Sequence, residues 1–434
     1  MSIEAADWPD DRIRIARIIA RLNIGGPAIQ AITLTACLEQ RGYSTTLVRG
    51  QEGPDEGSMD DLAHELAVAP VLVRWLRRDP GRHDLAALAA LTALMRREHP
   101  QIVHTHAAKA GTLGRLAALI AFPRRRSRPL LVHTYHGHSL TGYFSPRVAS
   151  VYRLIERVLG RCTDRLIAVS EEVRDELVEL GVAPKSEFEV IRLGFDLSAF
   201  AVDGDSRGRA RNALRAELGI PPDARVVTLI ARLVPIKRVD RFLQLAASLR
   251  DLSDVRFLIV GDGELREQLQ RAAIASELHD RLVWAGFRRD MPAVYFASDL
   301  VVQTSDNEGT PVSLIEAQAA GLPVVSTRVG GAASVMRPHT GCLVERDDHE
   351  GLTAAVRELL GDADRARQMG QAAAEHARAR FDLAHLIDEL DGVYRDLLRR
   401  RGMPHAASVR SRSCHHPSRR RNTSSVSSSH SSWP

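Results

Sequence analysis

The stretch IRIARIIARLNIGGP, residues 13–27, decides the fold class of this chain. IRIARIIA at its start predicts a buried strand, and RLNIGGP predicts the turn that follows it. We expect a helix from there to Gln40, and STTLVRG at 44–50 is a second strand. A strand, a helix and a further strand in this order form a β-α-β unit.

The same form recurs along the first half of the chain. IVHTHAAKAG at 102–111 is again a strand, a polar loop and the start of a helix. LVHTYHG (131–137) and RLIAVS (165–170) are further short strands with polar residues at their carboxyl ends. Because ligands bind at that edge of open parallel sheets, these polar residues are candidates for a site.

A second alternating series begins after EVIRLGFD (189–196) and the polar, glycine-containing stretch AVDGDSRGRA (201–210). Its strands are RVVTLIARL (225–233), VRFLIVGDGE (255–264), RLVWAGF (281–287), DLVVQTS (299–305) and LPVVSTRVGG (322–331). The predicted fold class is therefore α/β, with two sheets of similar size that face each other across a cleft.

The polar stretch between the two series is the best domain boundary in the chain. After Phe381 we expect an amphipathic helix, and then a Ser/Arg-rich tail that has almost nothing to bury and should be disordered. The expected segments are an N-terminal domain over 1–198, a linker over 199–210, a C-terminal domain over 211–382, a helix over 383–401 and the tail over 402–434.

Composition and charge exclude some classes of protein. With 44% hydrophobic and 26% charged residues, the chain is typical of globular proteins, and 434 residues suggest two domains. The formal charge of +5 is carried by the tail, which holds five arginines and no acidic residue. Because the body is then about neutral, we expect no nucleic-acid partner.

The cysteines, the start of the chain and the apolar runs bear on the compartment in which the protein is expected. Cys37, Cys162, Cys342 and Cys414 lie far apart without paired spacing, so disulfide and metal roles are not expected. The start of the chain, MSIEAADWPDD, is acidic and does not resemble a signal peptide. The longest apolar run, LAALAALTALM, is too short to span a membrane. We therefore expect a cytoplasmic protein.

Two carboxylates stand in NEGTPVSLIEAQAAGLP, residues 307–323, a stretch that otherwise predicts burial. Pro311 suits the first turn of a helix with Thr310 as its N-cap, which leaves Glu308 in the loop and Glu316 more than a turn inside. Eight helical residues span about 12 Å, so the carboxylates could hold different parts of one ligand. The helix N-terminus between them favours an anion. The alternative is one solvated glutamate and one that pairs with the dipole at the helix N-terminus.

Two cations follow the first strand of the second series. ARLVPIKR (231–238) places Arg232 and Lys237 five residues apart, just beyond the strand. A bidentate guanidinium and a compact ammonium could hold a diphosphate there, although a solvated basic loop would look the same. Arginine is otherwise so prevalent that the few lysines, Lys109, Lys185 and Lys237, can mark positions that need a point charge.

Paired glycines and clustered histidines are further candidates. Gly25 and Gly26 could let the backbone approach a phosphate, or could form a plain turn, and Gly261 is ambiguous in the same way. His104 and His106 lie in a different element from His133, His136 and His138, without a carboxylate or cysteine beside them, so a metal site is not expected. His136 is better suited to donate a hydrogen bond to a ligand. The DxD patterns at 203–205 and 362–364 predict solvated surface.

Taken together, GG after the first strand, HTYHG, ARLVPIKR, GDGE and E-x7-E before AAGLPVV resemble glycosyltransferase family 4, whose members are retaining enzymes of the GT-B fold. The resemblance covers residues 13–395, with the motifs in family order. It implies two Rossmann-like domains that face each other across an interdomain cleft. HTHAAKAG, YHGHSLTGYFSP and RLVPIK look most like bacterial transferases of capsule, exopolysaccharide or other envelope glycans.

The resemblance also implies a role for individual residues. Glu316 would hold the ribose of a nucleotide-sugar, and Glu308 the transferred sugar. His136 would face the sugar near the reacting carbon, so His136 and Glu308 form the implied catalytic pair. The implied diphosphate-binding set is Arg232, Lys237, Gly25, Gly26, Gly309 and Thr310; Gly261, Phe287 and Arg288 would lie near the base, and Lys109 on the acceptor side.

The implied reaction needs neither a metal nor another cofactor, because the cations and backbone N–H groups stabilise the departing diphosphate. The expected partners are a nucleotide-sugar donor, most often a UDP-sugar in this family, and a glycan or lipid-linked acceptor. The basic knot at 124–128 would suit contact with the inner face of the membrane, or a solvated loop. The alternatives are a sugar-nucleotide epimerase or hydrolase of the same architecture, and a non-catalytic nucleotide-sugar-binding protein.

Overall fold

The computed structural model describes residues 12–403, except for residue 24 and the segments 54–56, 78–79, 138–145 and 279. The side chains of residues 146–149 are also left out. The predictions made for the acidic start of the chain, for His138 and for the Ser/Arg-rich tail beyond residue 403 therefore lie outside the described residues.

The N-terminal half forms a parallel sheet of seven strands in the order β3-β2-β1-β4-β5-β6-β7. Neighbouring strands are in register as parallel pairs, with Ile15 of β1 opposite Ile102 of β4. The strands are β1 (Ile13–Ile19), β2 (Tyr43–Arg49), β3 (Val71–Leu72), β4 (Ile102–His106), β5 (Leu130–Tyr135), β6 (Arg165–Ala168) and β7 (Phe188–Val190).

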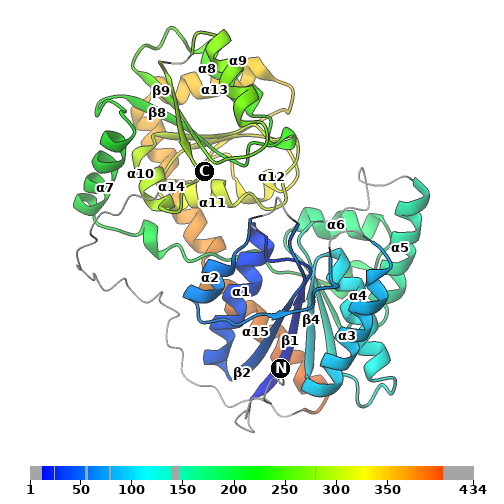
Figure 1. Ribbon diagram of the computed structural model, residues 1–434. Helices are drawn as coiled ribbons and strands as arrows, with labels where there is room; N and C mark the ends of the chain where they lie inside the picture. Colours follow the sequence, from blue (N-terminus) through cyan, green and yellow to red (C-terminus); the bar gives the residue numbers. More distant parts are fainter. Residues whose placement is uncertain are drawn as a thin grey trace, which may run out of the picture.

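The C-terminal half forms a second parallel sheet, of six strands in the order β10-β9-β8-β11-β12-β13. Its strands are β8 (Arg225–Ile230), β9 (Val255–Val260), β10 (Leu282–Gly286), β11 (Leu300–Gln303), β12 (Val324–Thr327) and β13 (Cys342–Val344). The predicted α/β architecture of two Rossmann-like bodies is therefore confirmed (Figure 1). The sequence did not predict the short edge strands β3 and β13.

Helices cover both faces of each sheet, because crossovers between parallel strands place them there. In the N-terminal body they are α1 (Gly26–Leu38), α2 (Asp60–Glu65), α3 (His83–Glu98), α4 (Ala108–Ala121), α5 (Pro146–Gly160) and α6 (Glu171–Glu179), with the one-turn helices η1 (Glu39–Arg41), η2 (Lys185–Glu187) and η3 (Ser198–Phe200).

The remaining helices belong to the C-terminal half of the sequence. They are α7 (Gly204–Glu217), η4 (Pro235–Lys237), α8 (Val239–Ser248), α9 (Arg266–Ala275), α10 (Met291–Ala297), α11 (Val312–Ala319), α12 (Ala332–Val335), α13 (His349–Gly361), α14 (Ala363–Phe381) and α15 (Leu383–Arg400). In Figure 1, α11 and α12 lie on the side of the C-terminal body that faces the N-terminal body.

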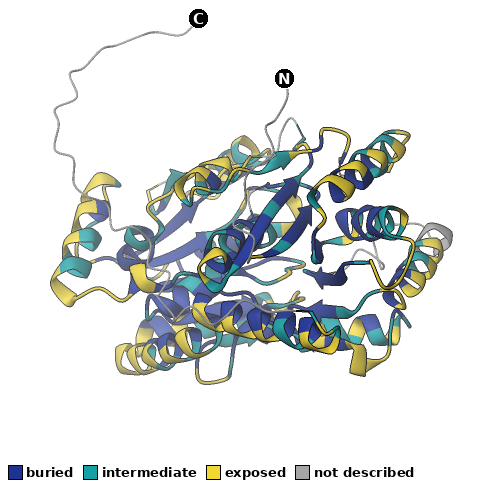
Figure 2. Cartoon of the chain, turned by 90° about the horizontal axis from the view of Figure 1, so that it is seen from below, coloured by how far each residue is buried: buried dark blue, intermediate teal, exposed yellow. Residues whose placement is uncertain are grey.

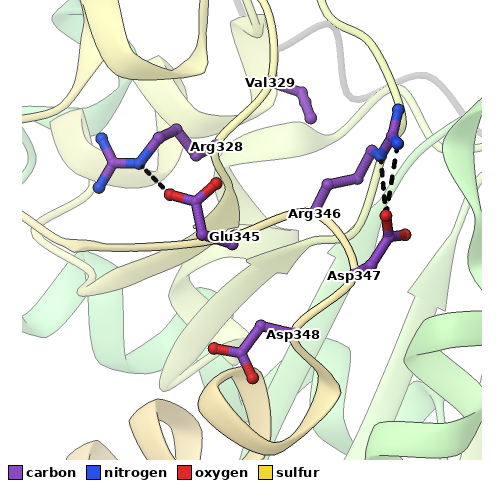
Figure 3. A pocket seen from close by; sticks show the side chains of 6 residues that line it. All are labelled: Arg328, Val329, Glu345, Arg346, Asp347 and Asp348. Atoms are coloured by element: carbon purple, nitrogen blue, oxygen red, sulfur yellow. Dashed lines mark hydrogen bonds and ion pairs between the residues drawn. The ribbon is translucent and has the colours of Figure 1, made fainter.

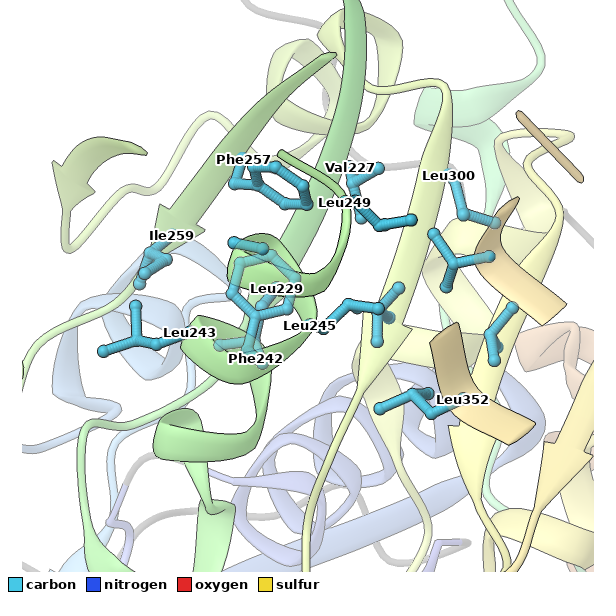
Figure 4. Close-up of a cluster of buried hydrophobic side chains, with 14 of the residues drawn as sticks. Val227, Leu229, Phe242, Leu243, Leu245, Leu249, Phe257, Ile259, Leu300 and Leu352 are labelled. Atoms are coloured by element: carbon cyan, nitrogen blue, oxygen red, sulfur yellow. The ribbon is translucent and has the colours of Figure 1, made fainter. Parts of the chain in front are cut away.

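The strands are buried on both faces, which explains their continuous apolar sequences (Figure 2). In the C-terminal body, Val227 and Leu229 of β8 pack with Phe257 of β9 against Phe242 of α8 (Figure 4). The Phe242 and Phe257 rings meet edge to face at a centroid distance of 5.9 Å. This layered burial holds the strand ends, and the loops that follow them, in fixed positions.

The chain crosses between the bodies twice, and the two crossings are bonded to each other. The backbone N–H of Phe195 donates to the carbonyl of Phe381 at 2.8 Å, and that of Leu383 donates to the carbonyl of Phe195 at 3.0 Å. A side chain at Gly194 would overlap Leu386 and the backbone at Asp382, so glycine permits this close approach. The crossings therefore form one hinge.

Helix α15 packs on the N-terminal sheet although its sequence follows the C-terminal body. Leu390 and Tyr394 are buried against Ile15 and neighbouring apolar side chains. Tyr43 donates a hydrogen bond to Asp391 at 2.6 Å, which fixes the helix to β2. The C-terminal end of the described chain is thus part of the first body.

Helix α7 begins inside the stretch that was expected to be a linker. The Asp203 carboxylate accepts a hydrogen bond from the Ser206 backbone N–H at 2.8 Å and so caps the helix that starts at Gly204. The segment 204–210 is therefore helical, and the glycines there did not indicate a loop. Asp362 caps α14 in the same way, so both DxD patterns begin exposed helix caps.

Strand order reverses between β1 and β4 in one sheet and between β8 and β11 in the other. Crevices for ligands open outside the carboxyl ends of parallel strands at such points. Among the described residues, no helix is both long enough and apolar enough to cross a lipid bilayer.

Candidate active site

The loop between β11 and α11 places Glu308 beside Lys237. The Lys237 ammonium lies 2.5 Å from the Glu308 carboxylate, and the Ser305 hydroxyl donates to the same oxygen at 2.6 Å. Lys237 ends η4, just beyond β8, so the pair joins the two strands on either side of the reversal point. Both side chains are mostly enclosed.

The backbone of this loop is held from two sides. Arg241 of α8 donates to the Thr304 carbonyl at 3.1 Å and pairs with Asp306 at 2.7 Å. Gly331 donates its N–H to the Glu308 carbonyl at 3.0 Å, and a side chain at Gly330 or Gly331 would overlap the loop. The loop is therefore preorganised by its neighbours.

Helix α11 begins one residue later than predicted. Its N-cap is Pro311, in an extended conformation, and no side chain caps it, so the predicted N-cap role of Thr310 is wrong. The Leu314 N–H instead donates to the Pro311 carbonyl at 3.2 Å. Gly309 and Thr310 still precede the helix N-terminus, where its first N–H groups are free for an anion.

Glu316 lies one turn into α11, well apart from Lys237. Tyr295 of α10 donates a hydrogen bond to it at 2.9 Å. Burial raises the pKa of Glu316 to about 7, and the Tyr295 hydrogen bond opposes that shift without cancelling it. The two carboxylates thus have different partners within the protein, and the expectation that they hold different parts of one ligand stays a prediction.

Arg232 is an exposed cation at the carboxyl edge of the C-terminal sheet. It follows β8, and no hydrogen bond or ion pair joins its side chain to another residue in the described part of the chain. Its guanidinium is therefore available to a ligand. Gly261 lies behind it, where a side chain would overlap the Ala231 carbonyl, so packing between the β8 and β9 loops accounts for that glycine.

The N-terminal body contacts this loop across the cleft. A side chain at Gly26, the first residue of α1, would meet Val312 of α11 at 3.6 Å and Leu193 at 3.1 Å. A side chain at Gly309 would meet the His136 carbonyl at 3.3 Å. The turn at Gly25 and Gly26, the loop at Gly309 and the end of β5 are therefore brought together.

A cavity of about 880 Å³ lies beside the hinge, and Arg232, Lys237, Glu308 and His136 are not among its lining residues. Ile29 of α1, Phe195 of the hinge, Met291 of α10 and Glu316 are among its lining residues, so both bodies contribute to it. This volume is sufficient for a nucleotide-sized ligand.

Phe287, Arg288 and Lys109 are less clearly placed. Phe287 is exposed, and Arg289, two residues further on, lines the cavity. Arg288 pairs with Glu217 and Asp290, each at 2.7 Å, so its charge is already balanced. Lys109 begins α4 and lies 2.5 Å from Asp84 of α3.

The histidines are closer together than the sequence interpretation allowed. Strands β4 and β5 are neighbours, so His106 Nδ1 lies 3.0 Å from His136 Nε2. The expectation that separate elements keep them apart was wrong. In the described part of the chain, no group of three His, Cys, Asp or Glu side chains is arranged to hold a metal ion.

Burial lowers the pKa of His136 to about 3, so the ring is neutral above mildly acidic pH.

A second hollow, of about 500 Å³, lies by the ends of β12 and β13 (Figure 3). Its charges are balanced in pairs, Arg328 with Glu345 and Arg346 with Asp347. In the cleft, by contrast, Arg232 is an exposed cation that follows β8, where the strand order reverses.

Comparison with known proteins agrees with this geometry. Residues 24–199 match the family model described as Glycosyltransferase Family 4, and residues 210–376 match Glycosyl transferases group 1. The UDP-Gal:alpha-D-GlcNAc-diphosphoundecaprenol alpha-1,3-galactosyltransferase of Escherichia coli is 30% identical over 397 residues, covering 89% of this chain and 98% of that protein.

A D-inositol 3-phosphate glycosyltransferase of Nocardia farcinica is 33% identical over 358 residues, covering 78% of this chain and 72% of that protein. Among solved structures, HepE of Anabaena in complex with UDP and glucose superposes with a TM-score of 0.71 at 21% identity, covering 88% of this chain and all of that one. This likeness shows a shared fold.

The fold is thus GT-B, the two-domain architecture of enzymes that use nucleotide-sugars. The chain belongs to glycosyltransferase family 4, as the sequence resemblance implied. It is a glycosyltransferase that uses a nucleotide-sugar donor, which decides against the epimerase, hydrolase and non-catalytic alternatives.

Several residues of the site were missed from the sequence. Ser305 and Tyr295 contact the two carboxylates, and Gly330 with Gly331 supports the loop that carries Glu308. The paired glycines after β12 were a usable signal, because they resemble the pair after β1. Ser305 and Tyr295 gave none, since only the tertiary fold brings them to their partners.

We expect the raised pKa of Glu316 to appear in the pH dependence of stability. Because the folded pKa of about 7 exceeds the ordinary 4.5, the protonated carboxyl is favoured by folding. This contribution is fully present below pH 4.5 and is lost as the pH rises to 7, by up to about 3 kcal/mol. Glu316→Gln should remove that dependence, measured by urea unfolding between pH 4.5 and 8.

The matched control is Glu375→Gln, on the exposed face of α14. It should leave the pH dependence of the parent protein unchanged. If Glu316→Gln follows the parent protein at every pH, the carboxyl is not held in the protonated form.

Proposed function

We propose that the chain transfers a sugar from a UDP-sugar to a glycan or lipid-linked acceptor in the synthesis of a cell-envelope or extracellular polysaccharide. The observation that carries this proposal is the placement of Lys237 and Glu308 at the helix N-terminus that meets the N-terminal body beside His136. A transferred sugar would lie there between the two bodies. The Escherichia coli relative is named for a UDP-Gal donor and a diphosphoundecaprenol-linked acceptor, which supports the UDP-sugar and the lipid-linked acceptor.

The diphosphate is assigned to Arg232, Lys237 and the N–H groups at the start of α11. The free guanidinium of Arg232 can bind it in a bidentate manner. An ammonium has three N–H donors, so Lys237 can contact a phosphate oxygen while it keeps Glu308. The turn at Gly25 and Gly26 approaches from the other wall, where a side chain at Gly26 would meet Leu193 at 3.1 Å.

The two carboxylates are assigned to the ends of the UDP-sugar. Glu316 would accept hydrogen bonds from the ribose hydroxyls, and this role requires the ionised form. Burial disfavours the ionised form, because it raises the pKa of Glu316. Ribose binding should therefore lower the pKa of Glu316. Glu308 would orient the hydroxyls of the transferred sugar, held in place by Lys237 and Ser305.

The reaction breaks the bond between the sugar C1 and the diphosphate oxygen and forms a bond from C1 to an acceptor hydroxyl oxygen. The electron pair of the broken bond stays on the diphosphate, whose negative charge grows. Arg232, Lys237 and the helix N-terminus stabilise that charge more in the transition state than in the ground state. We assign the acceptor proton to the departing diphosphate oxygen, with attack on the face that it leaves, which retains the configuration.

We also propose that the N-terminal body contacts the cytoplasmic face of a membrane through a basic surface at Arg124, Arg125 and Arg126. All three arginines are exposed after the end of α4, and Ile120 beside them is 48% exposed. Anionic headgroups attract such clusters, and an apolar neighbour adds contact with the lipid. A lipid-linked acceptor would then be presented at the surface of the enzyme.

Lys237→Ala should lower kcat by about 100- to 1000-fold, because the growing charge loses a preorganised cation. Glu308→Gln should cause a similar loss. The donor is first chosen from a panel of nucleotide-sugars by thermal stabilisation, and transfer is then measured with that donor. Lys185→Ala is the matched control. It removes an exposed lysine that pairs with Asp175, and it should keep full activity. Near-normal transfer by either site variant would contradict the assignment.

The membrane proposal predicts co-sedimentation with vesicles that contain phosphatidylglycerol and none with phosphatidylcholine alone. Replacing Arg124, Arg125 and Arg126 with alanine should abolish binding at physiological salt. A triple replacement of the exposed Arg271, Arg328 and Arg346 removes the same charge elsewhere and should leave binding intact. Equal losses in both triple variants would mean that net charge, not this surface, drives the binding.

A further inference from the structure

Arg17, in the middle of β1, is fully buried and has no carboxylate partner among the described residues. Its Nη1 lies 3.3 Å from His104 Nδ1 and 3.3 Å from His106 Nε2. Its Nη2 donates to the Tyr394 hydroxyl at 3.4 Å. Buried charges are normally paired with an opposite charge, so this arginine is expected to serve another purpose.

The contacts of Arg17 continue to the cleft through a row of rings. The His104 and His106 rings stack at a centroid distance of 4.3 Å, and the His106 and His136 rings follow at 5.3 Å. His106 Nδ1 lies 3.0 Å from His136 Nε2. Arg17 is therefore connected to His136 by two consecutive contacts.

The chemistry of the groups fixes the position of each proton in this row. A guanidinium can only donate hydrogen bonds, so His106 Nε2 must accept one from Arg17. Burial, with neighbouring histidines and Arg17, holds the pKa of His106 well below 6.5, so the ring is neutral. Its single proton is then on Nδ1, which donates to His136 Nε2.

The same reasoning applies once more at His136. The ring is neutral, because burial lowers its pKa to about 3. Since Nε2 accepts from His106, the proton of His136 must be on Nδ1. That nitrogen is buried and has no hydrogen-bond partner among the described residues. An unpaired buried N–H is costly, and a ligand oxygen would satisfy it.

We propose that Arg17, acting through His106, holds His136 in the neutral Nδ1–H tautomer, so that His136 donates a hydrogen bond into the cleft and does not act as a base. Arg17 and His106 are then positioning residues. Which ligand oxygen receives the bond, a sugar hydroxyl or a diphosphate oxygen, rests on the proposed function. The tautomer itself does not.

A side branch at His104 is consistent with the same proton arrangement. His104 Nδ1 faces Arg17 and also lies 2.5 Å from the Tyr394 hydroxyl, which can donate to it. Its proton is then on Nε2, which lies 2.8 Å from the Thr134 hydroxyl oxygen. Every contact in the network pairs a donor with an acceptor, and Tyr394 connects α15 to it.

The direct test is the tautomeric state of His136 in the full-length protein without any substrate. Two-bond ¹⁵N–¹H NMR spectra of protein labelled with ¹⁵N-histidine distinguish protonated from unprotonated ring nitrogens. Comparison with His136→Asn identifies the signals of that ring. We expect a protonated Nδ1 and an unprotonated Nε2 at pH 7.5. A protonated Nε2 would overturn the proposal, whether or not the protein transfers sugar.

Variants of Arg17 test its causal role. Arg17→Met removes the donor at similar size and should lose the Nδ1–H preference of His136. Arg17→Lys keeps a group that can only donate and should restore the preference. Arg14→Met, near the amino-terminal end of the same strand, removes an arginine that donates to the Glu98 carbonyl; it is the matched control and should keep the parent tautomer. An unchanged tautomer in Arg17→Met would overturn the role of Arg17.

Two replacements of His106 distinguish the hydrogen bond that its Nδ1 donates from the packing of its ring. The amide nitrogen of His106→Asn can occupy the place of Nδ1 and donate to His136, whereas His106→Leu cannot donate. We expect His106→Leu and Arg17→Met to lower kcat about tenfold or more with less than a threefold change in KM, because a misplaced proton weakens a transition-state contact. His106→Asn and Arg17→Lys should recover most of kcat. Equal losses in all four variants would mean a structural role only.

Discussion

The two crossings of the chain, bonded to each other at Phe195, are the constraint on which the site depends. Hydrogen bonds from Phe195 to Phe381 and from Leu383 to Phe195 join the segment that enters the C-terminal body to the segment that leaves it. The phenyl rings of Phe195 and Phe381 lie in one apolar cluster with Leu314 of α11. The two crossings are therefore held together at this point, and α11 is anchored beside it.

The walls of the cleft differ in charge. On the C-terminal wall, Arg232 and Lys237 follow β8 at the point where strand order reverses, and both carboxylates come from the segment after β11. The N-terminal wall presents glycine backbone and the neutral ring of His136. The cationic wall can thus take up the charge of a departing diphosphate.

The sequence predicted the features that depend on local pattern. Continuous apolar runs located the longer strands of both sheets, and the sequence placed Glu308 in the loop ahead of α11 and Glu316 inside that helix. It failed where distant segments decide the outcome. The segment at 204–210 is helical because Asp203 caps it, and His106 meets His136 because β4 and β5 are adjacent. Arg17 stands in an apolar strand, a departure from the pattern that could have been noticed, but its partners could not be read from the sequence.

A crystal structure of the protein with UDP bound would test the assignment of the cleft most directly. The diphosphate should lie within hydrogen-bond distance, about 3 Å, of the Arg232 guanidinium, the Lys237 ammonium and the N–H groups at the start of α11. The ribose should contact Glu316. Ordered UDP elsewhere on the protein, with Arg232 and Lys237 out of reach of the phosphates, would contradict it.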